Sequence, residues 1–302
     1  MRRGWGLVLL WWTACGGADE LVVPERSLLL AYQASLVQQS SRPYPFSMRS
    51  DEQGDTLFAD VLMDIPVSYT EFRQRLSAPR RWCDFLILHL NIKSCVAQER
   101  QGQETLVLYA GRKHYQPPEI TYKLEYRFQL QDNREQFFEV LMDAPRGPLS
   151  TADYRIHLRA IPYAGKTVVA LGLNYKQSFI SRAATYSYLN TLGRDKVGFS
   201  LLNETSAEDP NYVGGVKGVI ERNVMRYFLA LQIYLQSDIR ADSESFKQRL
   251  IAWYRASEQY HRQLYEYEQD IYLQAKQQEY LNQQQLQLEI DRKAAGSQRP
   301  AG

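Results

Sequence analysis

Residues 120–130 read ITYKLEYRFQL, and apolar and polar side chains alternate along their whole length. Such alternation is typical of a β-strand with one buried face and one solvated face. The same two-residue period recurs in five further segments, at residues 90–96, 104–110, 136–142, 152–160 and 166–176. Turn-forming pairs such as Asp132-Asn133 and Ala164-Gly165 separate some of these segments. We therefore expect an antiparallel meander whose apolar face must be covered by another layer.

The flanking segments supply one more strand and the covering helices. Residues 56–65 alternate in the same way, from Leu57 to Ile65, and predict a further strand. Helical spacing is found at residues 25–40, 68–76, 79–89 and 179–192. Residues 216–237 carry apolar side chains every three or four positions, which predicts a long amphipathic helix. The predicted fold class is α+β, with an antiparallel sheet of about seven strands packed around this helix.

A four-three apolar pattern continues from Phe246 to Leu288 and includes Trp253, Tyr260, Tyr267 and Ile271. It predicts a long helix or a helical hairpin with one adhesive stripe, in a segment that becomes rich in glutamine. Because the lysine-rich polar face of a membrane-surface helix is missing, we expect residues 246–288 to dock on their own domain, to self-associate as a coiled coil or to bind a protein partner.

The segments divide the chain into four parts. We expect a signal peptide at 1–18, a helix and linker at 19–50, the sheet domain at 51–240 and a helical, glutamine-rich extension at 241–302.

Composition excludes several classes of protein. The chain has 302 residues, of which 44% are hydrophobic and 23% charged, whereas a disordered chain would be poor in hydrophobic residues. Its 36 basic residues face 34 acidic residues without a basic block, so we expect no nucleic-acid partner.

The N-terminus is expected to direct export. Arg2 and Arg3 precede a short apolar run at 6–12, and small residues follow before Asp19. This order is typical of a cleaved secretory signal, and the run is far shorter than the ~20 residues that span a bilayer. The alternative is a lipoprotein anchored through Cys15, since Thr13-Ala14-Cys15 is similar to the end of a bacterial lipobox. We expect a periplasmic protein that contacts the membrane only if Cys15 carries lipid.

Removal or lipidation of Cys15 leaves an even pair, Cys83 and Cys95. Export into an oxidising compartment would let a disulfide between them persist. Two buried free thiols are the alternative.

Two segments resemble a known group of proteins. Residues 82–95, WCDFLILHLNIKSC, and residues 214–227, GGVKGVIERNVMRY, are similar to exported bacterial proteins of the START-like (SRPBCC) lipid-binding superfamily. The resemblance covers residues 42–240. It implies the helix-grip fold, in which a curved sheet wraps a C-terminal helix and leaves a hydrophobic cavity. A fold of this kind hosts many functions, so the resemblance is weaker evidence for function than for fold.

The resemblance implies that inward side chains of the sheet and of the C-terminal helix line a ligand cavity. The predicted lining residues are Tyr122, Leu124, Tyr126, Tyr154, Ile156, Leu158, Leu171, Leu173, Ile220, Val224, Tyr227 and Leu231. The same pattern also describes a solid core, because the sequence gives neither the side-chain packing nor the curvature of the sheet.

Arg222 and Arg226 are four residues apart on the predicted helix and share a side. One carboxylate or lipid phosphate could bridge both, so they are candidates for fixing an anionic head group. Pairing within the protein, with Asp60, Asp64 or Glu221, is the alternative and has the stronger physical basis, because buried charges are usually paired.

Motifs for metal, nucleotide or nucleophile chemistry are absent from the sequence, so we expect no metal and no cofactor. The main expectation is a non-catalytic protein that holds, and shuttles, a lipid-like hydrophobic ligand. The alternative is an assembly or scaffold protein that acts through its C-terminal helices. An enzyme would need convergent ionisable groups in the cavity, and Asp60, His89 and Glu221 are the candidates.

Overall fold

The computed structural model describes residues 24–37, 44–191, 193–202, 210–238 and 242–297. Its centre is an eight-stranded antiparallel sheet with the strand order β1-β2-β8-β7-β6-β5-β4-β3. The strands are β1 (Ser47–Gln53), β2 (Thr56–Ile65), β3 (Ile92–Arg100), β4 (Gln103–Ala110), β5 (Tyr122–Asn133), β6 (Phe138–Arg146), β7 (Ala152–Tyr163) and β8 (Lys166–Lys176). Strands β3 to β8 form the expected meander, and β2 closes back on β8.

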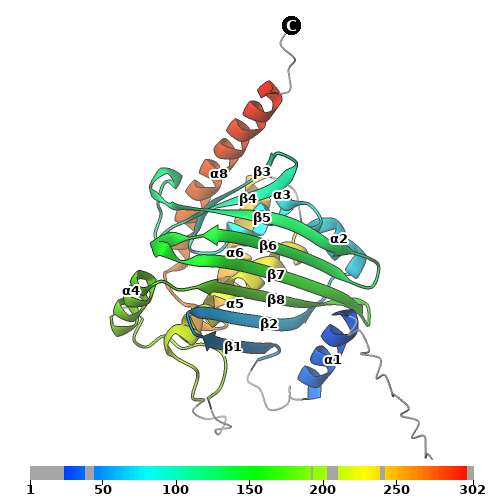
Figure 1. Ribbon diagram of the computed structural model, residues 1–302, viewed down its shortest axis with the longest axis vertical. Coiled ribbons are helices and arrows are strands. Elements are labelled where there is room, and N and C mark those ends of the chain that lie inside the picture. The colour runs from blue at the N-terminus through cyan, green and yellow to red at the C-terminus, as the bar shows by residue number, and fades with distance from the viewer. Residues whose placement is uncertain (1–23, 38–43, 192, 203–209, 239–241, 298–302) are drawn as a thin grey trace, which may run out of the picture.

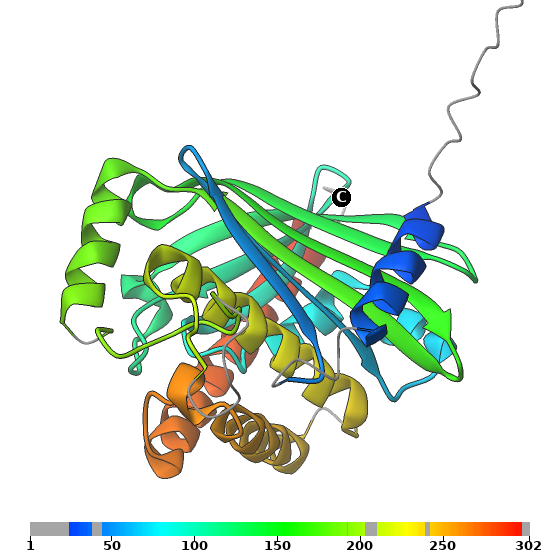
Figure 2. The same ribbon diagram turned by 90° about the horizontal axis from the view of Figure 1, so that it is seen from below.

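Helices cover one face of this sheet in two layers. The helices are α2 (Tyr69–Leu76), α3 (Pro79–Leu86), α4 (Phe179–Asn190), α5 (Gly215–Gln236), α6 (Ser243–Glu258), α7 (His261–Leu264) and α8 (Gln269–Ser297). Figures 1 and 2 show α5 running across the sheet, with α6 on the far side of α5. Helix α5 contacts β1, β2 and β8 directly. The predicted α+β helix-grip fold is confirmed.

The alternation that predicted the strands is visible in their burial. Along β2 every second side chain, from Leu57 to Ile65, is buried. Along β5 the buried side chains are Leu124, Tyr126 and Phe128. These residues belong to one apolar core that also includes the inner face of α5.

Helix α1 (Pro24–Val37) packs on the opposite face of the sheet, against β7. Leu28 and Tyr32 join Phe137, Ile161 and Val168 in a small separate cluster. The Tyr32 hydroxyl donates to Asp64 Oδ1 over 2.8 Å. The outer face of the sheet is therefore partly covered.

The sheet differs from the prediction at both edges. Strand β1 occupies residues 47–53, part of which was expected to be linker, because its sequence SMRSDEQ has no apolar alternation. In β3 the register shifts between Ile92 and Ser94. As a result Cys95, and not Val96, shares the core cluster with Ile92. Five consecutive β3 residues are buried because helix α8 covers this edge of the sheet.

The predicted disulfide is confirmed. Cys83 on α3 and Cys95 on β3 are bonded, with their Cα atoms 5.1 Å apart. The bond ties the helix that covers the core to the edge strand.

The C-terminal helices form a hairpin, and the predicted continuous stripe is wrong beyond Tyr267. Phe246, Leu250 and Trp253 are buried in the main core, as expected. After the break at 265–268, α8 turns a different side inward: Tyr272, Lys276, Glu279, Tyr280, Gln283 and Gln287 are buried. Ile271, Leu281 and Leu288 of the predicted stripe are exposed. The polar face of α8 is buried because it meets open backbone groups of the sheet edge. No helix among the described residues is both long and apolar enough to cross a bilayer.

Candidate functional site

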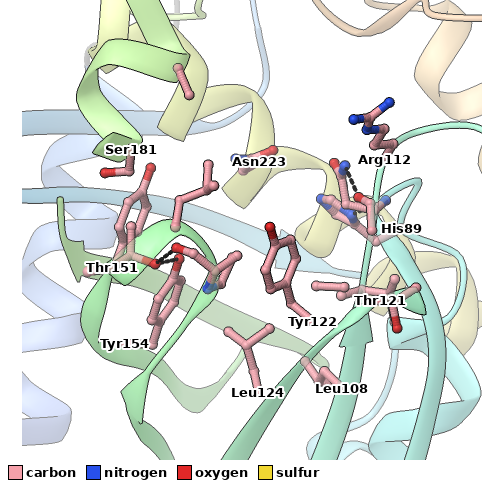
Figure 3. A pocket seen from close by; sticks show the side chains of 18 of the residues that line it. His89, Leu108, Arg112, Thr121, Tyr122, Leu124, Thr151, Tyr154, Ser181 and Asn223 are labelled. Atoms are coloured by element: carbon pink, nitrogen blue, oxygen red, sulfur yellow. Dashed lines mark hydrogen bonds between the residues drawn. The ribbon is translucent and has the colours of Figure 1, made fainter. Parts of the chain in front are cut away.

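A pocket of about 800 Å³ opens at one end of the sheet, between β4, β5, β8 and the helices α4 and α5. Its walls come from segments far apart in the sequence. They are His89, Asn91, Ile92, Leu108, Ala110, Gly111, Arg112, Gln116, Ile120, Thr121, Tyr122, Leu124, Tyr126, Pro148, Leu149, Thr151, Tyr154, Leu173, Tyr175, Gln177, Ser181, Ala184, Thr185, Tyr188, Val219, Asn223 and Tyr227. Figure 3 shows His89, Arg112 and Thr121 on one side of this space and Thr151, Tyr154 and Ser181 on the other.

Aromatic rings form much of the wall. Tyr154 stacks on Tyr175 with 5.0 Å between ring centroids, and Tyr126 meets Tyr154 edge to face at 6.5 Å. The Tyr154 hydroxyl is 2.9 Å from the Thr151 hydroxyl, which holds one ring in place. Burial raises the pKa of Tyr126 and Tyr154, so both phenols stay neutral. The aromatic part of the wall is therefore flat, uncharged and largely apolar, as suits an aromatic or hydrocarbon body.

The structure divides the twelve predicted lining residues into two sets. Tyr122, Leu124, Tyr126, Tyr154, Leu173 and Tyr227 line the pocket. The other six are buried in the solid core: Ile156, Leu158, Leu171, Ile220, Val224 and Leu231. Both sets lie on the predicted inner faces, and the space between sheet and α5 is open at one end and filled at the other.

His89 is the predicted candidate that reaches the pocket. It follows α3, is 2% exposed and stacks on Tyr227 with ring centroids 4.2 Å apart. Its Nδ1 accepts a hydrogen bond from the Asn91 backbone N–H over 3.1 Å. Burial, and then the nearby cations led by Arg226, hold the pKa of His89 well below its usual range. The imidazole is therefore neutral.

The mouth of the pocket combines a cation with exposed apolar side chains. Arg112 is exposed and forms no ion pair with any described residue. Ile120, Tyr122 and Leu149 also line the pocket and are exposed, Tyr122 at 52%. Helix α4 closes one side and turns Ser181 and Thr185 toward the pocket. Its Phe179 is 88% exposed, so apolar surface continues outward from the mouth.

The two predicted head-group residues do not line this pocket. Arg226 forms an ion pair with Glu266 at 2.7 Å, and Arg222 donates to the Val197 carbonyl oxygen over 3.1 Å. Burial lowers the pKa of Arg222 to about 10. The structure therefore shows the alternative, pairing within the protein. The carboxylate that pairs with Arg226 is Glu266, and not Asp60, Asp64 or Glu221. Glu266 was not a candidate because it follows Arg226 by forty residues.

Asp60 and Glu221 are also placed outside the pocket. Asp60 lies on the outer face of the sheet and pairs with Arg49 at 2.8 Å. Glu221 is fully buried and accepts hydrogen bonds from the backbone N–H groups of Phe199 and Ser200 and from the Ser50 hydroxyl. This carboxylate fastens the 193–202 segment onto α5 and β1. The three ionisable candidates are therefore not brought together.

Sequence reasoning missed the polar residues of the pocket. Arg112, Gln116 and Thr121 lie in the loop between β4 and β5, and Asn223 lies on α5 beside the two predicted arginines. The pair Pro117-Pro118 marked that loop as irregular, but no spacing rule connects it with α5. Among the described residues, no group of three or more His, Cys, Asp or Glu side chains is placed to hold a metal ion.

The helix-grip sheet and its aromatic pocket define a pocket-bearing α+β protein. No family model and no curated protein matches the chain. Among solved structures it is similar to TTHA0849 from Thermus thermophilus, with 12% identity, a TM-score of 0.39 and coverage of 59% of this chain and 96% of the other. It is also similar to Ara h 8.0201 (10% identity, TM-score 0.36, coverage 60% and 97%). Truncated norcoclaurine synthase from Thalictrum flavum gives 11% identity, a TM-score of 0.32 and coverage of 50% and 91%.

Proposed function

We propose that this protein is a START-like binding protein that holds a hydrophobic small molecule, lipid-like in character, in the pocket between the sheet and α5. The main observation that supports this proposal is the pocket itself, a space of about 800 Å³ lined largely by tyrosine and aliphatic side chains. Its volume lies within the roughly 300–1,000 Å³ typical of small-molecule sites. Removing apolar surface from water yields ~25 cal/mol per Å², so burial alone can supply the affinity without any catalytic step.

The mouth supports exchange of the ligand with its surroundings. Apolar side chains at Ile120, Leu149 and Phe179 extend from the rim to the surface. A hydrophobic ligand leaving the pocket would pass over apolar surface first, which lowers the cost of release into a membrane or a partner. This arrangement supports the proposed shuttling role.

Export completes the proposal. The composition of residues 1–18 and the disulfide between Cys83 and Cys95 are both compatible with secretion to the periplasm. Residues 1–18 and Cys15 lie outside the described part of the chain. Intact-mass measurement of the protein recovered from the periplasm of a bacterial host distinguishes a cleaved chain from one that carries lipid on Cys15. A full-length mass in the cytoplasm would contradict export.

The binding proposal is tested by native mass spectrometry of the purified protein, followed by denaturing extraction with organic solvent. We expect a co-purifying hydrophobic molecule at about one per chain. Leu124→Trp places a large ring in the pocket and should abolish this mass, because Leu124 lines it. Leu130→Trp, on the same strand but outside the lining, is the control and should keep the ligand. Equal ligand content in both variants would refute the proposed site.

A second candidate function is assembly through the C-terminal helices. Ile271, Leu281 and Leu288 are exposed along α8, and a groove of about 540 Å³ runs beside Ile271 and Leu281. Sedimentation measurements test this candidate. Leu281→Lys should dissociate an assembly that uses this face, and a wild-type protein that is monomeric at high concentration and binds no partner would remove the candidate.

A further inference from the structure

Two residues that line the pocket each have a buried side-chain atom without a hydrogen-bond partner among the described residues: Nε2 of His89 and Oε1 of Gln177. An unpaired buried polar group destabilises a protein, so such an atom calls for an explanation. In His89 the opposite ring nitrogen, Nδ1, already accepts the Asn91 N–H.

The hydrogen bond from Asn91 fixes what Nε2 can do. A neutral imidazole carries one proton, and Nδ1 must keep its lone pair to accept from Asn91. The proton therefore resides on Nε2, which makes Nε2 a donor. Stacking on Tyr227 holds the plane of the ring, so the direction of this donor is set before a ligand arrives.

The surrounding charges favour the same assignment. Arg226, Lys276, Lys93 and Lys113 all act on His89 and lower its pKa. These four cations are paired with only two carboxylates, Glu266 and Glu279. The ring therefore lies in positive potential, which favours an atom that brings a lone pair over one that brings a hydrogen.

We propose that the ligand of this pocket carries a carbonyl-type oxygen that accepts a hydrogen bond from His89 Nε2–H, attached to a flat apolar body that packs on the tyrosine wall. A carbonyl oxygen offers two lone pairs and no hydrogen, which matches a buried donor in positive potential. The inference rests on the proposed binding function and adds the chemical class of the ligand.

The test compares two probes that share a body and differ in one oxygen, 1-acetylpyrene and 1-ethylpyrene. Fluorescence titration should give both a measurable Kd, with 1-acetylpyrene binding about tenfold more tightly, the ratio that corresponds to ~1.4 kcal/mol. Equal affinities in the wild-type protein would overturn the inference and leave hydrophobic binding intact. If neither probe binds, the proposed function fails, and the inference fails with it.

Two substitutions at His89 separate its two nitrogens. His89→Asn keeps an acceptor near the Asn91 N–H but removes the outer donor, so the tenfold preference should disappear. His89→Gln extends an amide N–H toward the position of Nε2 and should restore most of the preference. His157→Asn, on the outer face of the sheet where His157 pairs with Glu139, is the control and should leave both affinities unchanged.

Infrared spectroscopy gives a readout that needs no variant to fold. The carbonyl stretch of 1-acetylpyrene labelled with ¹³C moves to lower wavenumber when its oxygen accepts a hydrogen bond. We expect this shift for the probe bound to wild-type protein, relative to the probe in cyclohexane. An unshifted band for bound probe would show that His89 does not donate to it and would overturn the inference.

Discussion

Two buried lysines share one buried glutamate where α8 meets the sheet edge. Glu279 lies 2.9 Å from Lys93 Nζ and 2.7 Å from Lys276 Nζ, and all three side chains are almost fully buried. The lysines also donate to backbone carbonyl oxygens: Lys93 to that of Leu90, and Lys276 to those of His89 and Ile92. They hold the turn that carries His89 in place.

Because Glu279 is the single carboxylate in this cluster, its loss should be severe. Glu279→Gln leaves two buried ammonium groups without a counter-charge, and we expect the free energy of unfolding to fall by about 3–5 kcal/mol. Lys276→Met leaves the Lys93–Glu279 pair intact and should cost clearly less. Urea denaturation of both variants measures the difference. Similar losses would mean that the hydrogen bonds to carbonyl oxygens, and not charge balance, dominate the cluster.

Lys276 also gives the protein a pH dependence. Burial lowers its pKa from 10.5 to about 8 in the folded protein. Between about pH 8 and pH 10.5 the unfolded chain binds this proton and the folded chain does not, so this residue makes the protein more stable as the pH rises. The slope is at most ~1.4 kcal/mol per pH unit. Urea unfolding from pH 7.5 to pH 10 should show this rise for wild type relative to Lys276→Met, and parallel curves would contradict it.

At the level of elements, α8 acts as the missing neighbour of strand β3. Gln283 Oε1 accepts from the Cys95 N–H, and Gln287 accepts from the Ala97 N–H and donates to the Ala97 carbonyl oxygen, each over 2.8 Å. These backbone groups lie on the edge of β3 that no strand of the described residues covers. Two glutamines thus satisfy an edge that would otherwise be open to pairing with another chain.

Removing these amides should expose that edge. The double variant Gln283→Leu, Gln287→Leu leaves buried backbone groups unpaired, at about 1–3 kcal/mol each. We expect a lower melting temperature and faster aggregation by light scattering. Gln284→Leu places the same side chain on the exposed face of α8 and serves as the control. A double variant as stable and soluble as this control would show that the amides do not protect the edge.

The elements that could be predicted are those in which the buried side chains are the apolar ones, because the spacing of apolar residues then marks the buried face. Strand β5 buries one apolar face, and helix α5 contributes a row of apolar side chains to the main core, so periodicity identified both, although α5 also buries Glu221, Arg222 and Arg226. Strand β1 is polar and at most partly buried, and helix α8 buries polar side chains against backbone groups or other polar groups. Their pattern therefore carried no signal, and the apolar Leu281 was assigned to the buried side when it is 61% exposed. The reason is that α8 packs against the edge of the sheet at β3, where the open backbone groups need hydrogen-bond partners.

For the whole molecule, the sequence predicted the inner surface but not where it is hollow. Leu171 and Leu173 lie on the same side of β8, yet Leu171 is in solid core and Leu173 faces the pocket. The difference arises from the position of α4 and of the β4–β5 loop at one end of the sheet. Those positions depend on long-range contacts that no local spacing encodes, which is also why Arg112 and Asn223 were missed.

This division predicts unequal costs for one substitution. Leu171→Ala opens a cavity in close-packed core and should lower the free energy of unfolding by about 2–5 kcal/mol. Leu173→Ala removes a side chain that already borders empty space and should cost at least ~1 kcal/mol less. Chemical denaturation of the ligand-free variants measures both. Equal losses would indicate that the pocket end is as tightly packed as the rest.

The glutamine contacts of α8 also limit how far a helix can follow a strand. Four residues of a helix rise ~6.0 Å, whereas two residues of a strand rise ~6.7 Å. Contacts between every fourth residue of α8 and every second residue of β3 therefore go out of register by ~0.7 Å at each repeat. Gln283 and Gln287 lie where the helical repeat and the strand repeat are still close to register. Four residues further along α8, Asp291 forms an ion pair with Arg80, with Oδ2 and Nη2 3.0 Å apart. Beyond this point α8 continues past the sheet (Figure 1). The mismatch between the rise of a helix and the rise of a strand thus works against a longer seam between α8 and β3.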